Sequence, residues 1–512
     1  MRKFGIILLV SASWLQPGCG DSAAEVTSPA NPPRERSATT GQQNDAIESS
    51  SQATAETESA QQEQQAASKQ AAAQQAPVDD LRTRTAGEDW PMFLGPTQDS
   101  KSTETGIITP WPEAGLKVVW AEESGEGYGA PSTSLGRLYH FDRVGNDARL
   151  RCLRAETGEQ LWKFTYPCVY EDRFGYSGGP RCAPVIDEDR VYIFGPAGKL
   201  HCLNAISGDV IWKHDTNADF HVIQNFFGVG STPIVEGDLL ICVVGGSPAE
   251  QQDVPPQMFN EIDGADSGIV AFDKMTGELK YQSSDELACY ASPVIREMGG
   301  RRVGLAFMRG GLLGFAPDSG DSLFHFPWRA KVWECVNASN PVVVDDQIFI
   351  SECYGPGSAL LQLNEAANAP KLDVIWSDED KGRNKSLQTH WNTPIHLDGF
   401  LYASNGRNAN PAELRCVEMQ TGNVMWKHDP GIGRSSLLYA DDHLICLGEY
   451  GDLLLIKVRN DEVEIVSRWQ PQDANGRALL RTPSWAAPVL SHGLLYLRGA
   501  DKLICVELIP DA

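Results

Sequence analysis

Residues 183–215 read APVIDEDRVYIFGPAGKLHCLNAISGDVIWKHD, and this stretch contains one complete copy of a unit that recurs along the 512-residue chain. Short runs rich in β-branched and aromatic side chains alternate with turn residues, which is typical of β-strands. The expected strands are PVI (184–186), RVYIF (190–194), GKLHCL (198–203) and VIW (210–212). No segment shows a sustained helical period. The unit therefore predicts four short antiparallel strands joined by tight turns.

The last part of the unit is repeated most closely. It reads CLRAETGEQLWKF at 152–164, CLNAISGDVIWKHD at 202–215 and CVEMQTGNVMWKHD at 416–429. The Gly in each copy can adopt the positive φ that a tight turn between strands needs. A Trp on the outer strand offers a large ring that can fill the wedge between two neighbouring sheets. We interpret the repeated Trp as a packing residue rather than a chemical one.

The number of units follows from where they open and close. A small or polar residue followed by Pro opens seven units, and Leu437 takes this place in one more; the prolines are Pro131, Pro184, Pro233, Pro293, Pro341, Pro394 and Pro488. The closing aromatic residues are Trp162, Trp212, Tyr281, Phe324, Trp376, Trp426 and Trp469. The spacing, roughly 43 to 60 residues, is in the range of propeller blades.

The last unit lacks its closing Trp, and a surplus Trp120 stands in KVVWAEE (117–123), before the first opening. If this strand pairs with KLICVEL (502–508), the ring closes and no sheet edge is left unpaired. The sequence therefore predicts an all-β fold over residues 89–512. This fold is an eight-bladed β-propeller of four-stranded antiparallel blades, closed by an N-terminal strand.

The N-terminal residues have the features of an export signal. MRKFGIILLVSASWLQPGC (1–19) has a basic start, a short apolar run and small residues before the cysteine, which predicts a signal peptide over 1–18. LQPGC resembles a bacterial lipobox, which implies lipidation of Cys19; ordinary secretion is the alternative. Residues 19–88 are of low complexity, and we expect a disordered tether. The expected location is a membrane-anchored lipoprotein facing the periplasm, or otherwise a secreted or periplasmic protein.

Charge and cysteine usage exclude several partners and folds. The formal net charge is −25 and no Lys/Arg-rich run is present, which argues against nucleic acid and against membrane contact other than through a lipid anchor. The cysteines form no adjacent pair and no C-x-x-C motif. Cys168 and Cys182 are the one pair we consider for a disulfide, and their pairing stays open.

AFDKMTGELKY (271–281) and the Trp-ending copies resemble the tryptophan-docking repeats of quinoprotein-type, PQQ-like β-propellers. DWPMFLGP (89–96) and WNTPIHLDGFLYASNG (391–406) are similar to segments of exported PQQ-like propeller proteins abundant in planctomycete-type bacteria. Members of that group are often labelled by their similarity to the BamB-type outer-membrane assembly lipoprotein. The resemblance implies the fold, and it implies an outer-membrane assembly scaffold with envelope proteins as partners as one function. It leaves the function of this chain open.

The resemblance also implies an alternative, a PQQ-dependent alcohol or sugar dehydrogenase. Such enzymes hold PQQ between a Trp face and a disulfide of adjacent cysteines, and a Ca²⁺ bound by Glu, Asn and Asp polarises the quinone. This chain has no adjacent cysteines and no haem motif, although Glu334, Asn337 and Asn392 are candidate ligands. GYSGG (175–179) matches G-x-S-x-G by chance, because it leads into a strand rather than a helix. We therefore predict no catalytic residue, no cofactor and no metal.

The loops that join a closing strand to the next opening strand line one end of a propeller channel. Here they are unusually aromatic, with Arg and Asn interspersed, as in recognition surfaces. The candidate ligand-binding residues at this channel mouth are Tyr128, Tyr176, Arg181, Tyr290, Trp333, Asn337, Trp391, Arg434 and Trp485. We expect a non-catalytic propeller that binds a protein, peptide or small ligand there. The alternative is that these loops only pack against one another and fill the channel.

Overall fold

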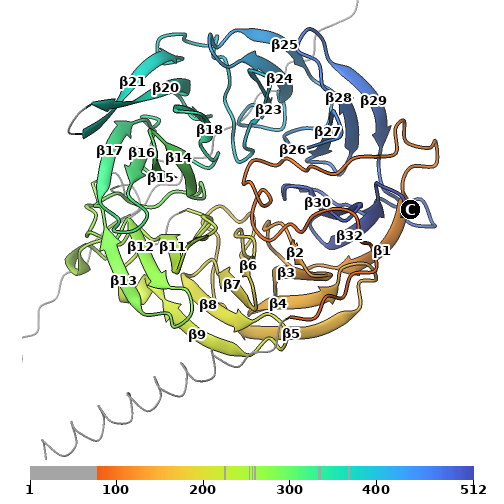
Figure 1. The fold of residues 1–512 in the computed structure, drawn as a ribbon, viewed down its shortest axis with the longest axis horizontal. Coiled ribbons are helices and arrows are strands. Elements are labelled where there is room, and N and C mark those ends of the chain that lie inside the picture. Colours follow the sequence, from red (N-terminus) through yellow and green to blue (C-terminus); the bar gives the residue numbers. More distant parts are fainter. Residues whose placement is uncertain are drawn as a thin grey trace, which may run out of the picture. The chain divides into compact units, whose positions relative to one another are not determined.

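The computed structural model describes residues 78–511, except 224–225, 253, 256–257, 259–260, 333–335 and 367–368. The described residues belong to one compact unit and form a ring of eight four-stranded antiparallel sheets (Figure 1). Helix is confined, in this part of the chain, to short turns such as α2 (Thr216–Asp219) and η1 (Ala249–Gln251). No helix among the described residues is long and apolar enough to span a membrane. The predicted eight-bladed propeller is confirmed.

The first four blades each follow the predicted strand order, from the inner strand to the outer one. Blade 1 contains β2 (Ser132–Ser134), β3 (Arg137–Val144), β4 (Asp147–Arg154) and β5 (Gln160–Pro167). Blade 2 contains β6 (Val185–Asp187), β7 (Arg190–Phe194), β8 (Lys199–Asn204) and β9 (Val210–Asp215). Blade 3 contains β10 (Ile234–Glu236), β11 (Leu239–Val243), β12 (Ile269–Asp273) and β13 (Leu279–Ser283). Blade 4 contains β14 (Val294–Met298), β15 (Arg301–Phe307), β16 (Gly311–Phe315) and β17 (Ser322–Pro327).

The next three blades repeat this order, and the last one differs. Blade 5 contains β18 (Val342–Val344), β19 (Gln347–Glu352), β20 (Gly357–Ala366) and β21 (Ala369–Ser377). Blade 6 contains β22 (Ile395–Leu397), β23 (Phe400–Asn405), β24 (Glu413–Glu418) and β25 (Val424–His428). Blade 7 contains β26 (Ser435–Ala440), β27 (His443–Gly448), β28 (Leu453–Lys457) and β29 (Glu464–Trp469). Blade 8 contains β30 (Val489–Ser491), β31 (Leu494–Arg498) and β32 (Lys502–Glu507), with β1 (Lys117–Glu123) as its outer strand.

The closure by the N-terminal strand is therefore as predicted. β1 runs antiparallel to β32, and Trp120 faces Cys505 across the ladder. Figure 1 shows β1 beside β32, close to the C-terminus. The same cross-strand partnership joins Cys202 to Trp212 in blade 2. The recurring Cys is thus a small core residue beneath the closing Trp, as expected for a thiol in an apolar strand.

The repeated turn glycine lies under the closing aromatic ring of the preceding blade. Gly208 has φ +78°, and a Cβ placed there would lie 2.6 Å from the indole of Trp162. The Nε1 of Trp162 donates a 3.1 Å hydrogen bond to the carbonyl oxygen of Ala205 in the same turn. Trp212 repeats the arrangement on the next blade, with Nε1 donating to the carbonyl oxygen of Lys274 at 3.1 Å. The Gly and the Trp of the repeat therefore join each blade to its neighbour.

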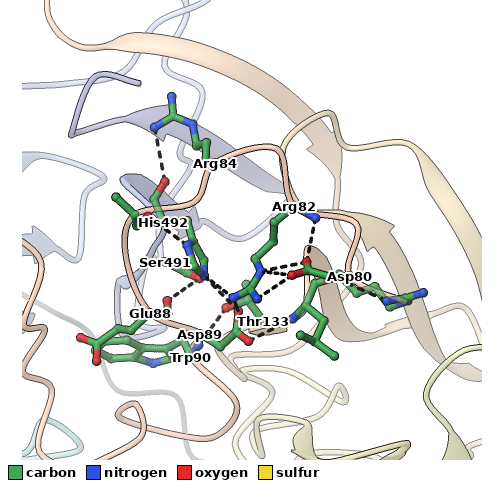
Figure 2. A network of polar contacts seen from close by, with 12 residues as sticks. Asp80, Arg82, Arg84, Glu88, Asp89, Trp90, Thr133, Ser491 and His492 are labelled. Carbon is green, nitrogen blue, oxygen red and sulfur yellow. Dashed lines mark hydrogen bonds and ion pairs between the residues drawn. The ribbon is translucent and has the colours of Figure 1, made fainter. Parts of the chain in front are cut away.

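Residues 78–108, called the N-terminal strap from here on, begin against blades 8 and 1. We expected residues up to 88 to belong to the tether, but residues 78–88 contact the propeller (Figure 2). Arg84 pairs with Glu507 and donates to the carbonyl oxygen of Ile509 at 2.9 Å. Ser491 Oγ donates to the carbonyl oxygen of Glu88 at 2.8 Å. The earlier part of the expected tether, the signal peptide and Cys19 all lie outside the described residues.

The strap then crosses the central channel. The carbonyl oxygen of Trp90 accepts a hydrogen bond from Thr133 in β2, and that of Pro91 accepts one from Ile186 in β6. On other sides of the ring, Arg296 in β14 donates to the carbonyl oxygen of Thr97, and Lys101 bridges in parallel to Tyr439 in β26. Figure 1 shows this orange segment in the centre of the ring. The strap therefore forms a floor across the channel, beneath the loops that enter the inner strands.

The cysteines of the described part of the chain are all buried. Cys168 and Cys182, the pair considered for a disulfide, are not bonded to each other. Burial raises the pKa of the Cys182 thiol to about 12, so this thiol stays protonated at neutral pH. These cysteines are packing residues rather than reactive groups.

Candidate functional site

Most of the residues chosen from the sequence meet in one cavity of about 190 Å³ at the channel mouth. The seven that line it are Tyr128, Tyr176, Arg181, Tyr290, Trp391, Arg434 and Trp485. They come from six loops that each join an outer strand to the next inner strand. Every blade turns its inner strand toward the axis, so these loops converge on the same point.

Asn337 and Trp333 are the two remaining candidates. Asn337 does not line the cavity; its side chain is buried and donates to the carbonyl oxygens of Met308 at 2.8 Å and Trp328 at 3.1 Å. It holds two loops together instead of facing the mouth. Trp333 lies outside the described residues, as does Glu334. Asn392, a candidate ligand under the dehydrogenase alternative, does line the cavity.

Aromatic rings form a nearly continuous wall around the cavity. The ring centroid of Trp485 lies 4.7 Å from that of Tyr128 and 4.9 Å from that of Trp391. The wall continues from Trp391 to His390 at 4.9 Å. From Trp485 the wall also continues through Tyr176 at 5.7 Å to Phe227, which lies 5.5 Å from Tyr290. These distances are those of favourable tilted ring pairs, so the wall is held by the rings themselves.

Three guanidinium groups lie over rings of this wall, and two of them, those of Arg181 and Arg434, belong to the cavity lining. The guanidinium carbon of Arg434 lies 4.5 Å from the ring centre of Trp391 and 5.0 Å from that of Trp485. Its nitrogen atoms pair with Glu449 at 2.5 and 3.0 Å. Arg181 pairs with Asp172 at 2.5 Å, so both arginines of the cavity lining have a carboxylate partner. The guanidinium carbon of Arg407, outside this lining, lies 4.0 Å from the ring centre of Tyr354.

His390 is held neutral beside the cavity. Burial, together with the positive charges of Arg434 and Arg407, lowers its pKa to about 3. Its two ring nitrogens contact the Tyr354 hydroxyl at 3.2 Å and Arg434 at 3.4 Å. A neutral imidazole with both nitrogens engaged is poorly placed to accept a proton from a substrate.

Glu352 lies at the end of β19, two residues before Tyr354 of the cavity lining. Burial raises the pKa of its carboxyl group to about 7, although the backbone N–H groups of Tyr354 and Gly355 donate to it and oppose the rise. The carboxyl group thus fixes the turn that carries Tyr354. It is a positioning group, because it binds the backbone of this turn.

Sequence reasoning missed several lining residues. Phe227 lies in a mouth loop, and His390 directly precedes Trp391, so the aromatic composition of the loops was a usable signal for both. Phe93, Leu94 and Ser100 line the cavity from the strap. Nothing local in DWPMFLGP indicates that these residues reach the channel. Their position depends on contacts with inner strands that are distant in sequence.

The cavity does not fit PQQ with Ca²⁺. Its volume of about 190 Å³ is below the range of about 300–1,000 Å³ that is usual for small-molecule and cofactor sites. No adjacent cysteines exist in the sequence to form the expected disulfide. Within the described ranges, no three His, Cys, Asp or Glu side chains converge in a way that could hold a metal ion. The two arginines that could face an anionic cofactor are already paired with carboxylates.

Comparison with known proteins gives one family match and several structural neighbours. A family model described as outer membrane protein assembly factor BamB matches residues 146–428. BamB from Moraxella catarrhalis is 13% identical, with 84% of this chain and 96% of that chain covered and a TM-score of 0.35. Quinohemoprotein alcohol dehydrogenase from Comamonas testosteroni is 13% identical, with coverage of 85% and 83% and a TM-score of 0.42. Among curated proteins, none matches the sequence significantly.

Proposed function

This chain belongs to the family of the outer membrane protein assembly factor BamB, a family of PQQ-like repeat propellers, and we propose that it is a non-catalytic cell-envelope propeller. We propose that it binds a protein or peptide partner at the mouth cavity. The observation that supports this most directly is the convergence of seven aromatic and arginine side chains, from six loops, on one cavity. Aromatic and Arg side chains are the residues most enriched at the energetic centres of interfaces.

The size of the cavity favours one inserted side chain over a whole small molecule. A cavity of about 150 Å³ is known to hold a benzene-sized ring, whereas typical small-molecule pockets begin at about 300 Å³. At about 190 Å³, this cavity has room for one large side chain.

The rim of the cavity favours a macromolecular partner. Tyr176 is 57% exposed, and its neighbours Phe174 and Val169 on the same loop are 46% and 83% exposed. The Phe174 ring lies 5.6 Å from Phe227 of the cavity wall, so exposed apolar surface continues outward from the cavity. Such continuous apolar surface is typical of a protein-binding site.

The polar groups of the site support a binding role rather than a chemical one. His390 has a pKa lowered to about 3 by burial and by nearby arginines. Arg181 and Arg434 are engaged by carboxylates. Among the described residues that line the cavity, no Asp or Glu stands with His390, so the lining lacks the carboxyl–imidazole pair that could divide the acid and base roles of proton transfer.

The test of this proposal is a selection of random displayed peptides on the immobilised chain. We expect saturable binding of selected peptides, and we expect Trp485→Ala to weaken it. Trp426→Ala is the matched control, because Trp426 lies on the outer strand β25, bonds to the next blade and does not line the cavity. Failure to recover any saturable peptide would remove the proposed binding role, and dye-linked oxidation of an alcohol with added PQQ and Ca²⁺ would remove the non-catalytic part.

We also propose that the chain is exported and anchored through lipidated Cys19, as its N-terminal sequence predicts. The family match supports an envelope location. Cys19→Ala should move the protein from the membrane fraction to the soluble periplasmic fraction. Equal fractionation of both forms would contradict the lipid anchor.

A further inference from the structure

We infer that the mouth cavity anchors its partner through one uncharged aromatic side chain. This inference rests on the proposed binding function and names the chemistry of the group that enters the cavity. It follows from what the cavity wall already contains: arginines on its ring faces, carboxylates on the two lining arginines, and tyrosine hydroxyl groups bonded to the backbone or to His390.

A positively charged side chain is excluded first. An aromatic wall attracts a cation through the negative faces of its rings. Here Arg434 already lies over Trp391 and Trp485, at 4.5 and 5.0 Å from their ring centres. Arg181 lies over Tyr128 and Phe227 at 5.5 and 5.3 Å. The faces that a Lys or Arg of the partner would use carry resident guanidinium groups, which repel a second cation.

A negatively charged side chain is excluded by the partners of those arginines. The Asp172 side chain that pairs with Arg181 is 2% exposed, and the Glu449 side chain that pairs with Arg434 is 6% exposed. Separating a buried ion pair leaves a carboxylate without a partner in a poorly solvated place, which is strongly unfavourable. Inside the cavity, an incoming Asp or Glu would have to break one of these pairs, because the neighbouring Arg407 is exposed to solvent outside the lining.

A polar uncharged side chain gains little from the tyrosine hydroxyl groups of the wall, because these groups are already bonded. The Tyr128 hydroxyl donates to the carbonyl oxygen of Tyr176 at 2.9 Å. The Tyr290 hydroxyl accepts from the backbone N–H of Phe227 at 2.9 Å. The Tyr354 hydroxyl contacts His390 at 3.2 Å. A polar ligand would lose its bonds to water and find these hydroxyl groups occupied. Among the described residues of the lining, the indole N–H groups of Trp391 and Trp485 and the Oδ1 of Asn392 are the buried polar atoms left without a partner.

An aromatic ring fits the remaining features of the cavity, which are its floor, its tilted rings and its volume. The floor of the cavity is mostly apolar, because Phe93 and Leu94 of the strap line it with Leu437 of β26, beside the single hydroxyl of Ser100. The walls are ring edges and faces set at tilted angles, such as the 58° between Tyr128 and Trp485. A further ring can join such a wall edge to face, which an aliphatic side chain cannot. The volume admits one ring and excludes a much larger group.

The experiment uses the N-acetyl amides of Phe, Leu, Lys and Glu as probes of the purified chain. Their dissociation constants are measured by ligand-observed NMR. We expect the Phe amide to bind at least about 10-fold more tightly than each of the others, since ring pairing and desolvation both favour it. In a variant with Ala487→Phe, which places a resident ring in the cavity lining, the Phe amide should lose this advantage. Ala338→Phe fills the same cavity from another loop and serves if the first variant does not fold.

The outcomes separate this inference from the proposed function. If the Lys, Glu or Leu amide binds as tightly as the Phe amide, or if the Phe advantage survives in both filled variants, the aromatic anchor is wrong. Peptides from the display selection would in that case still bind, and the propeller would keep its binding role. If neither the amides nor any displayed peptide binds, the proposed function itself fails, and the anchor with it.

Discussion

The indole Nε1 of Trp120 donates a 2.9 Å hydrogen bond to the carbonyl oxygen of Ala155, which joins the last blade to the first. Trp120 precedes every complete blade in the sequence, yet it occupies the outer strand of blade 8. A Cβ on Gly158 would lie 3.0 Å from its ring, so the contact repeats the Trp-on-Gly packing found between other blades. The two ends of the chain therefore seal the ring with the same contact that joins the other blades.

Deletion of residues 1–123 should cause aggregation. The deletion removes the strap and β1, leaves β32 as an unpaired sheet edge, and exposes part of the inter-blade core. Light scattering after gel filtration measures the effect, and deletion of residues 1–77, which leaves the strap in place, is the control. A monomeric, soluble protein lacking residues 1–123 would show that the ring does not need this strand.

Trp212→Ala should lower the free energy of unfolding by about 3–5 kcal/mol, the usual result of removing a buried large aromatic side chain. Trp212 is buried, contacts Tyr192 and Phe272, and donates a hydrogen bond to the next blade. Denaturant unfolding followed by circular dichroism measures the loss. A loss of less than about 1 kcal/mol would contradict the inter-blade packing role.

Trp391→Ala should leave stability nearly unchanged, within about 1 kcal/mol, but weaken binding of a selected peptide by at least about 10-fold, as truncation of a central interface aromatic does. Trp391 is half-buried and lies in a mouth loop rather than between blades. Calorimetric titration and thermal unfolding of the same preparation distinguish the two effects. A large fall in melting temperature with unchanged affinity would assign Trp391 to packing.

Stability should fall as the pH drops from about 6.5 toward 4, in part because of His201. Burial, and next the charges of Lys213 and Lys199, lower the pKa of His201 to about 4, whereas an unfolded chain binds that proton near pH 6.5. Between these values the unfolded state binds more protons, so each pH unit lowers the unfolding free energy by up to about 1.4 kcal/mol. His201→Phe, which keeps a ring beside Tyr166, should reduce the slope of unfolding free energy against pH. An identical slope in the two proteins would show that His201 does not contribute to the loss of stability at low pH.

The blade architecture could be predicted because the sequence of each blade contains the pattern within a short stretch. The Gly–Trp spacing recurs within a few residues, and Trp120 was recognisable as surplus once the closing residues had been counted. The mouth residues could be predicted for a related reason. Since the blade order fixes where each connecting loop emerges, an aromatic residue such as Trp485 in that loop has to lie near the axis.

The cavity floor, the position of Asn337 and the order of the strap could not be predicted, because they depend on contacts between residues that are distant in the sequence. Phe93 and Leu94 form the cavity floor because the strap bonds to β2, β6, β14 and β26, strands from distant parts of the sequence. Asn337 was placed at the mouth by its loop alone, but its amide bonds to the carbonyl oxygens of Met308 and Trp328. The strap was assigned to the tether up to residue 88 because its composition is polar. Its order comes from pairing with blade 8 through Arg84 and Ser491.

The strap also determines which contacts of the propeller are loaded first when the N-terminal residues are pulled. Any pull transmitted from residues 1–77 enters the fold at residue 78, well before β1 in the sequence. Such a load first meets the contacts of Arg84 with Glu507 and Ile509, and then the backbone bonds of Trp90 and Pro91. The ladder between β1 and β32, on which ring closure depends, comes later along the chain, so it is loaded only after these contacts have broken. The contacts of the strap therefore protect the pairing of β1 with β32 from a force applied to the N-terminal residues.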